Sequence, residues 1–398
     1  MTPPAPHLNC QTPTAADPTT ASVLPAFTGP PLPHDLVQGR NTTIVVIDTG
    51  ASAPGVTGDR ESCILHGTAV ASAARATAPA AKIHSLRHSD RVDVVEGTVD
   101  GLIAAIHRAK ALPTRHKIVN ISMVTCEDSP PLRTAVESLL DTGVIVVASI
   151  GNSGQCDPGK PTYPAATPGV IAVGAVEETA VLGNSGETKD PKAQSPAAVN
   201  LGRTPAPYGI EGIPSTLHAP GGPVHAQLQR GRPDSKDVSL IAGAPDPFVG
   251  TSFATPIVAG TATLVWEADP TLSAKDVTKI LVESAIPAGG VSGEPTHLAS
   301  VVSPRAAVTA ARDAHRSQQP NTTVAGQHQD SNGDPATSPS GNTQITAAVT
   351  QPVTPDYSVA FGLSAIVSVV LVVGLIARAF ASDKTPPSGS ERTTRQGT

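Results

Sequence analysis

The fold of this chain is decided by residues 250–260, which read Gly-Thr-Ser-Phe-Ala-Thr-Pro-Ile-Val-Ala-Gly. Small and apolar residues recur here as in a buried helix, and the Gly-Thr pair predicts a turn that leads into it. We therefore expect Ser252 at or just before the helix N-terminus, with its hydroxyl facing a cleft. Because a serine alone is a poor nucleophile, such a site also needs a base, an acid that orients the base, and an oxyanion donor.

Composition sets the broad class of the protein. The 398 residues suffice for one large domain or two ordinary ones, and with 2 % aromatics the core must consist of Ala, Val, Ile and Leu. Forty prolines and 35 glycines predict long loops and at least one disordered segment. A net charge of -6 gives no reason to expect nucleic-acid binding. The sequence has no CxxC or HExxH pattern, so we expect neither a metal site nor a cofactor.

Strand and helix patterns alternate between residues 41 and 315. The predicted strands are 42–48, 82–87, 117–123, 144–148, 169–176 and 238–242. The predicted helices begin at His66 and near 94, 133, 251, 274 and 304, whereas 178–236 is interpreted as a long loop region. This alternation predicts an α/β fold, a doubly wound and mostly parallel sheet with helices on both faces.

The segments outside 41–315 have a different character. Residues 1–40, rich in Pro and Thr, predict an extended N-terminal arm, and 316–356 predict a disordered linker. Residues 357–377 carry no charge and would span about 31 Å as a helix, so we expect a transmembrane helix, with a buried core helix as the alternative. Basic residues outnumber acidic ones in 378–398, which predicts a cytoplasmic tail and an extracytoplasmic domain. An exported domain requires a signal peptide, which the first residues do not resemble, so we expect a start further upstream or a signal that has been cut off.

Four polar residues lie at the ends of predicted elements. Asp48 and Asn152 follow strands at the carboxyl edge of the sheet, where sites form in open α/β folds. His66 begins a helix. His66 would accept the proton of Ser252, Asp48 would orient the imidazole, and the Asn152 amide with the Ser252 N–H would stabilise the oxyanion. Each motif alone is also compatible with a simple turn or helix start, but together and in this order they favour a catalytic triad.

These motifs carry a family resemblance. Asp48-Thr49-Gly50, His66-Gly67-Thr68 and the segment 250–256 resemble those of subtilisin-family serine proteases (subtilases, peptidase family S8). The chain is most similar to the mycosins, the membrane-anchored subtilases of actinobacterial type VII secretion. The features that carry this match are the cysteine-bearing arm, residues 83–87, Cys156 close after Gly151-Asn152, and the C-terminal apolar segment.

The resemblance implies a membrane-anchored, extracytoplasmic serine endopeptidase acting on protein or peptide substrates with a type VII secretion membrane complex. One alternative is a mainly structural stabiliser of that complex with low proteolytic turnover; another is a surface protease unconnected to secretion. The resemblance also implies disulfides Cys10–Cys63 and Cys126–Cys156. The second has separate support, since both cysteines follow predicted strands that would share a sheet edge; free thiols are the alternative.

The chain departs from the family pattern around the substrate pocket. The pocket residues implied by the resemblance are Ser122, Met123, Val124, Ser149, Ile150 and Gly151. Val124 stands where subtilases commonly have glycine, and Ile150 where they commonly have alanine. Both add bulk, so we predict a narrow pocket and a preference for small P1 residues or weak activity. Asn120-Ile121-Ser122 matches a glycosylation sequon, but its predicted burial in a strand excludes that role, and His88 is expected to pack or lie at the surface.

Overall fold

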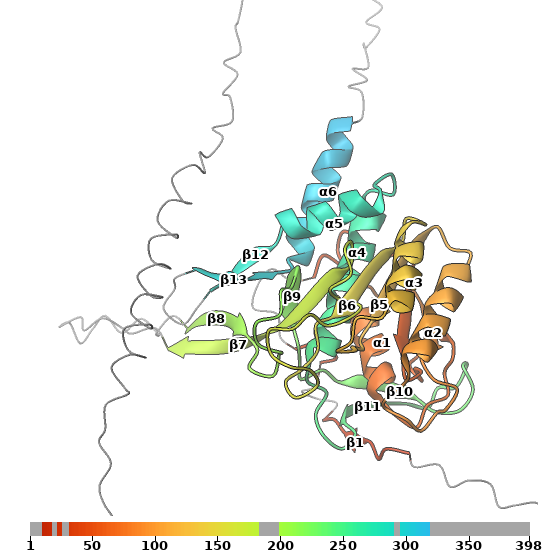
Figure 1. Cartoon of the computed structure of the whole chain (residues 1–398). Coiled ribbons are helices and arrows are strands. Elements are labelled where there is room, and N and C mark those ends of the chain that lie inside the picture. Colours follow the sequence, from red (N-terminus) through yellow and green to blue (C-terminus); the bar gives the residue numbers. More distant parts are fainter. Residues whose placement is uncertain (1–9, 18–21, 26–31, 183–198, 290–294, 319–398) are drawn as a thin grey trace, which may run out of the picture. The chain divides into compact units, whose positions relative to one another are not determined.

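The computed structural model describes residues 10–17, 22–25, 32–182, 199–289 and 295–318 (Figure 1). Ten strands form one sheet, in the order β12-β13-β9-β7-β6-β5-β2-β4-β3, with β8 paired to β7. The strands are β2 (Thr42–Asp48), β3 (Val56–Gly58), β4 (Lys82–Arg87), β5 (His116–Ile121), β6 (Ile145–Ser149), β7 (Ile171–Leu182), β8 (Val199–Pro205), β9 (Leu217–Pro220), β12 (Ile286–Gly289) and β13 (Pro295–Val301). In the sheet order from β9 to β3, each strand pairs in parallel with the next. In contrast, β8 and β12 are antiparallel to their neighbours. The predicted α/β fold with a mostly parallel sheet is confirmed.

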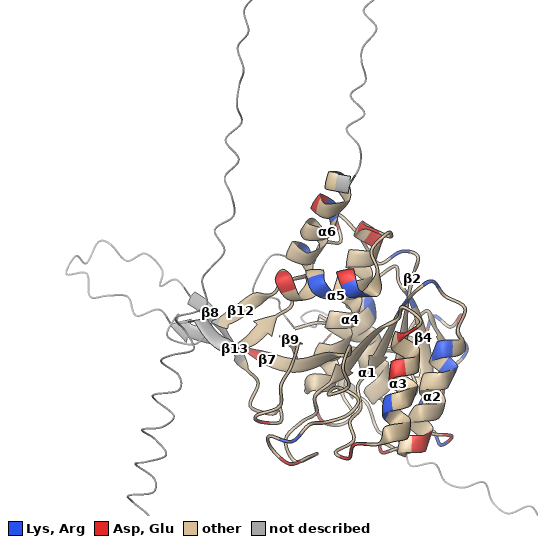
Figure 2. Ribbon diagram, turned by 45° about the horizontal axis from the view of Figure 1, so that its top comes forward, with Lys and Arg blue, Asp and Glu red and all other residues tan. Residues whose placement is uncertain are grey.

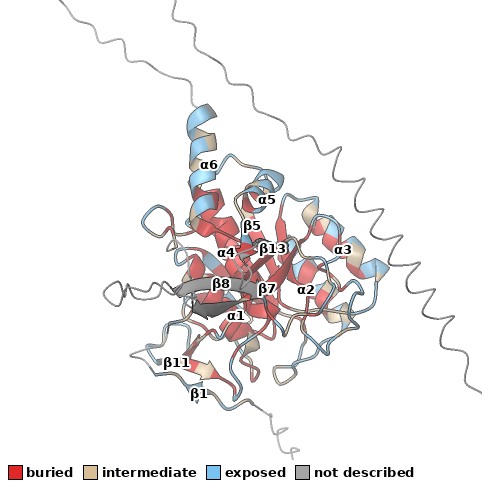
Figure 3. Cartoon of the chain, turned by 90° about the vertical axis from the view of Figure 1, so that its left-hand side faces the viewer, coloured by how far each residue is buried: buried red, intermediate tan, exposed pale blue. Residues whose placement is uncertain are grey.

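Helices cover both faces of the sheet. They are α1 (His66–Thr77), α2 (Val99–Ala111), α3 (Pro130–Leu140), α4 (Thr251–Ala268), α5 (Ala274–Glu283) and α6 (Pro304–Gln318). One core cluster joins the sheet to α1, α4, α5 and α6, and a second joins it to α2 and α3. Figure 3 shows that α4 is buried along its length, and Figure 2 shows charged residues gathered on the outer helices. The arrangement matches the α4 sequence, whose only charged residue is Glu267.

Strand β2 illustrates why these residues form a doubly covered sheet. All seven of its residues are buried. Ile44 and Val46 belong to the cluster with α1 and α4, while Val45 and Ile47 belong to the cluster with α2 and α3. Because successive strand residues point to opposite faces, a strand covered on both faces must be apolar at every position.

Two expectations about the middle of the chain are wrong. The region 178–236 is not one long loop, because β7 extends to Leu182 and β8, β9 and the strand β10 (Ala226–Gln229) follow. The strand β11 (Val238–Gly243) does not rejoin the main sheet; it pairs with β10 and with β1 (Thr14–Ala15) in a separate three-stranded sheet. Strands β9 and β10, with four residues each and Pro and Gly around them, are too short to show a period of two in the sequence.

The N-terminal arm is joined to the domain at several points in its described parts. Besides the pairing of β1 with β11, the Ala16 N–H donates to Leu240 O at 3.0 Å. Further on, the Glu267 carboxylate at the end of α4 accepts the backbone N–H groups of Gln38, Gly39 and Arg40. The arm is therefore packed on the domain rather than extended away from it in these stretches.

Within the described residues, no helix is both long and apolar enough to cross a membrane. The predicted transmembrane segment 357–377, the tail 378–398 and the predicted linker from residue 319 onward lie outside the described residues.

Candidate active site

Asp48 and His66 form a hydrogen-bonded pair at the carboxyl edge of the sheet. Asp48 is the last residue of β2 and is fully buried, and His66 is the first residue of α1. The His66 Nδ1 lies 2.8 Å from Asp48 Oδ1 and 3.0 Å from Oδ2. The Thr49 N–H also donates to Oδ1, at 2.7 Å, which fixes the carboxylate. Because a carboxylate only accepts, Nδ1 carries the proton and Nε2 is left as the basic nitrogen.

Residue 67, directly after His66, must be a glycine because Gly50 and Asp48 lie very close to it. A Cβ on Gly67 would lie 2.3 Å from Gly50 O and 2.9 Å from Asp48 Oδ1, which no side chain could tolerate. The Gly67 N–H instead donates to Thr49 Oγ1 at 3.1 Å. The Asp-Thr-Gly and His-Gly motifs thus have a joint physical reason, since each fits the backbone of the other.

Opposing effects act on the pKa of His66. Burial disfavours the charged imidazolium and lowers the pKa, but the negative charge of Asp48 and its hydrogen bond together outweigh burial and raise the pKa above its ordinary 6.5. A base with a raised pKa holds a captured proton more strongly, which suits a group that must accept the proton of a serine hydroxyl.

Ser252 lies in the first turn of α4 and shares a cavity of about 690 Å³ with Asp48, His66 and Asn152. Its preceding turn depends on Gly250, whose φ of 151° lies in the region that favours glycine. The Phe253 ring packs against the His66 ring, with centroids 5.1 Å apart. The structure therefore brings the three predicted triad residues to one cavity from β2, α1 and α4.

The carbonyl of Ser252 is held by a residue from β5 and its extension. In a regular helix the N–H of residue 256 would donate to the oxygen of residue 252, but Pro256 has no N–H. The Ser122 Oγ–H takes its place and donates to Ser252 O at 2.8 Å. In the opposite direction, Ser252 Oγ donates to Ser122 O at 3.3 Å. The first turn of α4 is thus bound to Ser122 through both the backbone and the side chain of Ser252.

Asn120 completes this network and has a role that the sequence did not indicate. Its Nδ2 lies 2.9 Å from Ser122 Oγ. Since the one hydroxyl proton of Ser122 is given to Ser252 O, Asn120 must be the donor, which fixes the orientation of its amide. Asn120 is fully buried, as the exclusion of the sequon requires.

Asn152 has the orientation that an oxyanion donor needs. Its Oδ1 accepts the Thr251 N–H at 2.9 Å and the Thr251 hydroxyl at 3.3 Å. The oxygen end of the amide is therefore bound to the first turn of α4, and Nδ2 stays available to donate. Because Ser252 lies in the first turn of α4, its N–H has no acceptor four residues earlier within the helix and can act beside Nδ2.

The predicted pocket residues divide into two groups. Ser122, Met123 and Val124 line the cavity, as expected. Ser149, Ile150 and Gly151 are buried and do not line it. The expectation that Ile150 narrows the pocket is wrong, because its side chain packs in the core cluster with α2 and α3.

Other lining residues escaped the sequence interpretation. They are His88, Val95, Glu96, Gly97, Thr98, Val99, Leu102, Gln155 and Val249 among others. His88 is buried, and its Nδ1 donates to the Asp48 carbonyl oxygen at 2.9 Å. Its position just after β4, next to the strand that carries Asp48, was the one signal that could have placed it here.

Both disulfides implied by the resemblance are present in the structure, Cys10–Cys63 and Cys126–Cys156. Cys126 also lines the cavity. Among the described residues there is no group of His, Cys, Asp and Glu side chains that could hold a metal ion.

Comparison with known proteins gives the family. Residues 46–331 match the Subtilase family of S8 peptidases, so the chain belongs to the subtilase family, whose members are serine endopeptidases. Among curated relatives, the minor extracellular protease Epr of Bacillus subtilis is 32 % identical over 190 residues, 42 % of this chain and 28 % of that protein. Subtilisin E of the same species is 25 % identical over 271 residues, 62 % of this chain and 61 % of that protein. The chain thus spans less than two thirds of the length of either relative.

Solved structures share the fold. MycP1 from Mycobacterium smegmatis has a TM-score of 0.56 at 20 % identity, over 75 % of this chain and 88 % of that one. A cold-adapted subtilisin-like serine proteinase has a TM-score of 0.51 at 20 % identity, over 71 % of this chain and 94 % of that one. At such identities the likeness concerns the fold alone.

Proposed function

We propose that this chain is a serine endopeptidase in which Ser252 attacks the carbonyl carbon of a peptide bond. The observation that carries the proposal is the His66–Asp48 hydrogen bond, with Nε2 left basic, beside Ser252 in one cavity. Membership of the subtilase family supports it. Neither a metal ion nor a cofactor is needed for this chemistry.

The reaction follows from the positions of these groups. As Ser252 Oγ bonds to the carbonyl carbon, its proton passes to His66 Nε2, and Asp48 stabilises the resulting imidazolium. The negative charge on the carbonyl oxygen is bound by Asn152 Nδ2 and the Ser252 N–H. His66 then gives the proton to the leaving amine, and the ester on Ser252 is hydrolysed by a water molecule that His66 deprotonates.

A fluorophosphonate probe tests the nucleophile directly. The folded wild-type chain should form a covalent adduct on Ser252, and Ser252→Ala should form none. Ser138→Ala, which changes a serine on the outer helix α3, is the matched control and should label as the wild type does. Absence of labelling in folded wild-type protein would exclude a serine protease.

The expected substrate preference rests on Val124, the bulky departure from the family pattern that does line the cavity. Val124 lines the cavity, and its Cγ1 lies 3.3 Å from the position that a Cβ on Gly151 would take. We expect cleavage after small P1 residues of protein or peptide substrates. Efficient hydrolysis after large aromatic P1 residues in a peptide panel would refute this, and Val124→Gly should broaden the preference.

We further propose that the protease is a mycosin-type component of type VII secretion, anchored in the cell membrane through 357–377, with its domain outside and its C-terminus in the cytoplasm. Support comes from the cysteine-bearing arm, the uncharged segment 357–377 and the fold. A second MycP1 structure, described as an essential component of the type VII (ESX-1) secretion system, has a TM-score of 0.54 at 21 % identity over 75 % of this chain.

Genetics separates a proteolytic from a mainly structural role in that complex. If the chain acts chiefly as a stabiliser of the membrane complex, deletion of its gene abolishes secretion while Ser252→Ala preserves it. If proteolysis is essential, both abolish it. Secretion that survives gene deletion would exclude the type VII assignment, and cleavage of the domain by protease added to intact cells tests its outward orientation.

A further inference from the structure

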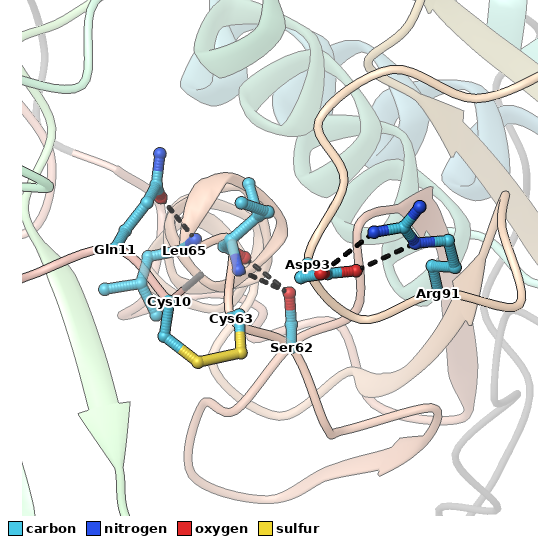
Figure 4. The surroundings of a disulfide bond; sticks show 8 residues. Cys10, Gln11, Ser62, Cys63, Leu65, Arg91 and Asp93 are labelled. Carbon is cyan, nitrogen blue, oxygen red and sulfur yellow. Dashed lines mark hydrogen bonds and ion pairs between the residues drawn. A yellow bond between two sulfur atoms is a disulfide. The ribbon is translucent and has the colours of Figure 1, made fainter. Parts of the chain in front are cut away.

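We infer that Gln11, on the N-terminal arm, is a positioning residue for His66. The inference rests on the proposed function, since it assumes that His66 is the base of a serine protease. Figure 4 shows the contact that carries it: the side chain of Gln11 reaches the backbone of Leu65, the residue directly before the histidine.

Helix α1 has no capping side chain of its own. Leu65 stands at the N-cap position, where a Ser, Thr, Asp or Asn would normally accept an N–H of the first turn, and no such cap bond is present. The Leu65 N–H itself points out of the helix and needs an acceptor. Gln11 Oε1 provides it at 2.8 Å, across 54 residues of sequence. The peptide that enters the helix at His66 is thereby fixed by a residue of the arm.

Gln11 is itself firmly held in this position. Its N–H donates to Cys63 O at 2.9 Å, so Gln11 bonds the segment 63–65 at both ends. The preceding residue is joined to the same segment through the Cys10–Cys63 disulfide. At Thr14 the arm enters β1 and pairs with β11. A side chain whose backbone is fixed on both sides loses less conformational entropy when it forms its hydrogen bond.

The segment 62–65 is also bound from its other side. The Cys63 N–H donates to Val92 O at 2.7 Å, next to the ion pair of Arg91 with Asp93 (Figure 4). Within the segment, Ser62 Oγ bonds both the N–H and the carbonyl of Ile64. Removal of the Gln11 side chain would therefore leave this turn folded and still joined to the arm at Cys63, but with the Leu65 N–H deprived of its acceptor.

The arm does not reach the active-site cavity in its described parts. None of residues 10–17 and 22–25 lines the cavity of Ser252. Cys10, Gln11 and Pro13 border a separate hollow of about 610 Å³. The described arm thus acts on catalysis through the backbone that precedes His66 and not by covering Ser252.

Three variants test the role of Gln11. Gln11→Met keeps the length of the side chain but removes the acceptor, Gln11→Glu keeps an acceptor, and Thr12→Ala changes an exposed arm neighbour as the control. Gln11→Met should lower kcat on the order of tenfold with KM within about twofold, because a displaced base impairs proton transfer more than substrate binding. Gln11→Glu and Thr12→Ala should stay close to the wild type.

The pH profile and amide exchange distinguish positioning from general stabilisation. Gln11→Met should move the acidic limb of kcat to lower pH, since a displaced imidazole loses part of its stabilisation by Asp48. The Leu65 amide should also exchange faster with solvent in this variant. A Gln11→Met enzyme with unchanged kcat, pH profile and Leu65 exchange would overturn the inference, as would a Gln11→Glu enzyme equally impaired. If the wild type neither turns over nor reacts with a fluorophosphonate, the proposed function fails, and Leu65 exchange still reports whether Gln11 fixes this turn.

Discussion

Ser122→Ala should destabilise the domain, and Pro256→Ala should restore much of the loss. In the wild type, the Ser252 carbonyl oxygen accepts from Ser122 Oγ at 2.8 Å because Pro256 lacks the N–H that would reach it in a regular helix. Ser122→Ala therefore leaves a buried oxygen without a donor. Pro256→Ala supplies a helical N–H to that same oxygen.

The expected loss of stability follows from the number of hydrogen-bonding groups that Ser122→Ala leaves without a partner. One buried acceptor without a partner costs about 1–3 kcal/mol, and Asn120 Nδ2 also loses its acceptor in Ser122→Ala. A loss of that size corresponds to a Tm decrease of roughly 2–12 °C at about 2–4 °C per kcal/mol for a domain of this class. The helical bond formed in the double variant should return about 0.5–1.5 kcal/mol.

Urea unfolding measures the coupling free energy between Ser122→Ala and Pro256→Ala. The cycle consists of four proteins: the wild type, the two single variants and the double variant. Ser85→Ala is the matched control: Ser85 Oγ is buried on strand β4 of the same sheet and has no hydrogen-bond partner, so its loss should be neutral or slightly stabilising and additive with Pro256→Ala. Effects of Ser122→Ala and Pro256→Ala that add within about 0.5 kcal/mol would refute a shared acceptor at Ser252.

Three further results are expected. The acidic limb of kcat/KM should have its midpoint above 6.5, because Asp48 raises the pKa of His66, and Asp48→Asn should lower kcat by about 10⁴ and move that limb to lower pH. Asn152→Asp keeps an acceptor for the first turn of α4 but loses the amide donor, so kcat should fall by about 10²–10³ in steady-state assays with little change in Tm. Glu267→Gln should reduce the free energy of unfolding by about 1–2 kcal/mol in urea titrations, since the carboxylate accepts three N–H groups of 38–40. Those N–H groups hold the pKa of Glu267 below its ordinary 4.5 despite its burial, so this stabilisation should be present at neutral pH and be lost as the pH falls through the lowered pKa.

The sheet and the triad could be predicted because their signals are local. In β2, apolar residues at consecutive positions require cover on both faces, and the acid that ends the run must lie at the carboxyl edge. The structure bears this out, with Val45 and Ile44 in different core clusters. Gly67 is likewise explained by the motifs themselves, because Gly50 and Asp48 leave no room for a Cβ at this position.

The supports of the triad could not be predicted, because they depend on contacts between distant residues. Gln11 meets Leu65 and Ser122 meets Ser252 across 54 and 130 residues, and nothing local to either position signals a partner. The expectation for Ile150 came from the family resemblance, whereas the alternation of faces along β6 continues through it: Val146, Ala148 and Ile150 all pack in the core cluster with α2 and α3.

Each member of the triad depends on a different part of the fold for its position. Asp48 is bound by the loop that follows its own strand, through the Thr49 N–H, and Ser252 by the extension of β5. The turn before His66 is bound from two sides: Thr49 Oγ1 donates to Ile64 O at 3.1 Å, and Gln11 of the arm accepts the Leu65 N–H. Proton transfer needs the three groups in the correct mutual geometry, so displacement of any one of them lowers the rate. The docking of the arm at Cys63 and Leu65 is therefore expected to influence turnover, although Gln11 does not line the cavity of Ser252.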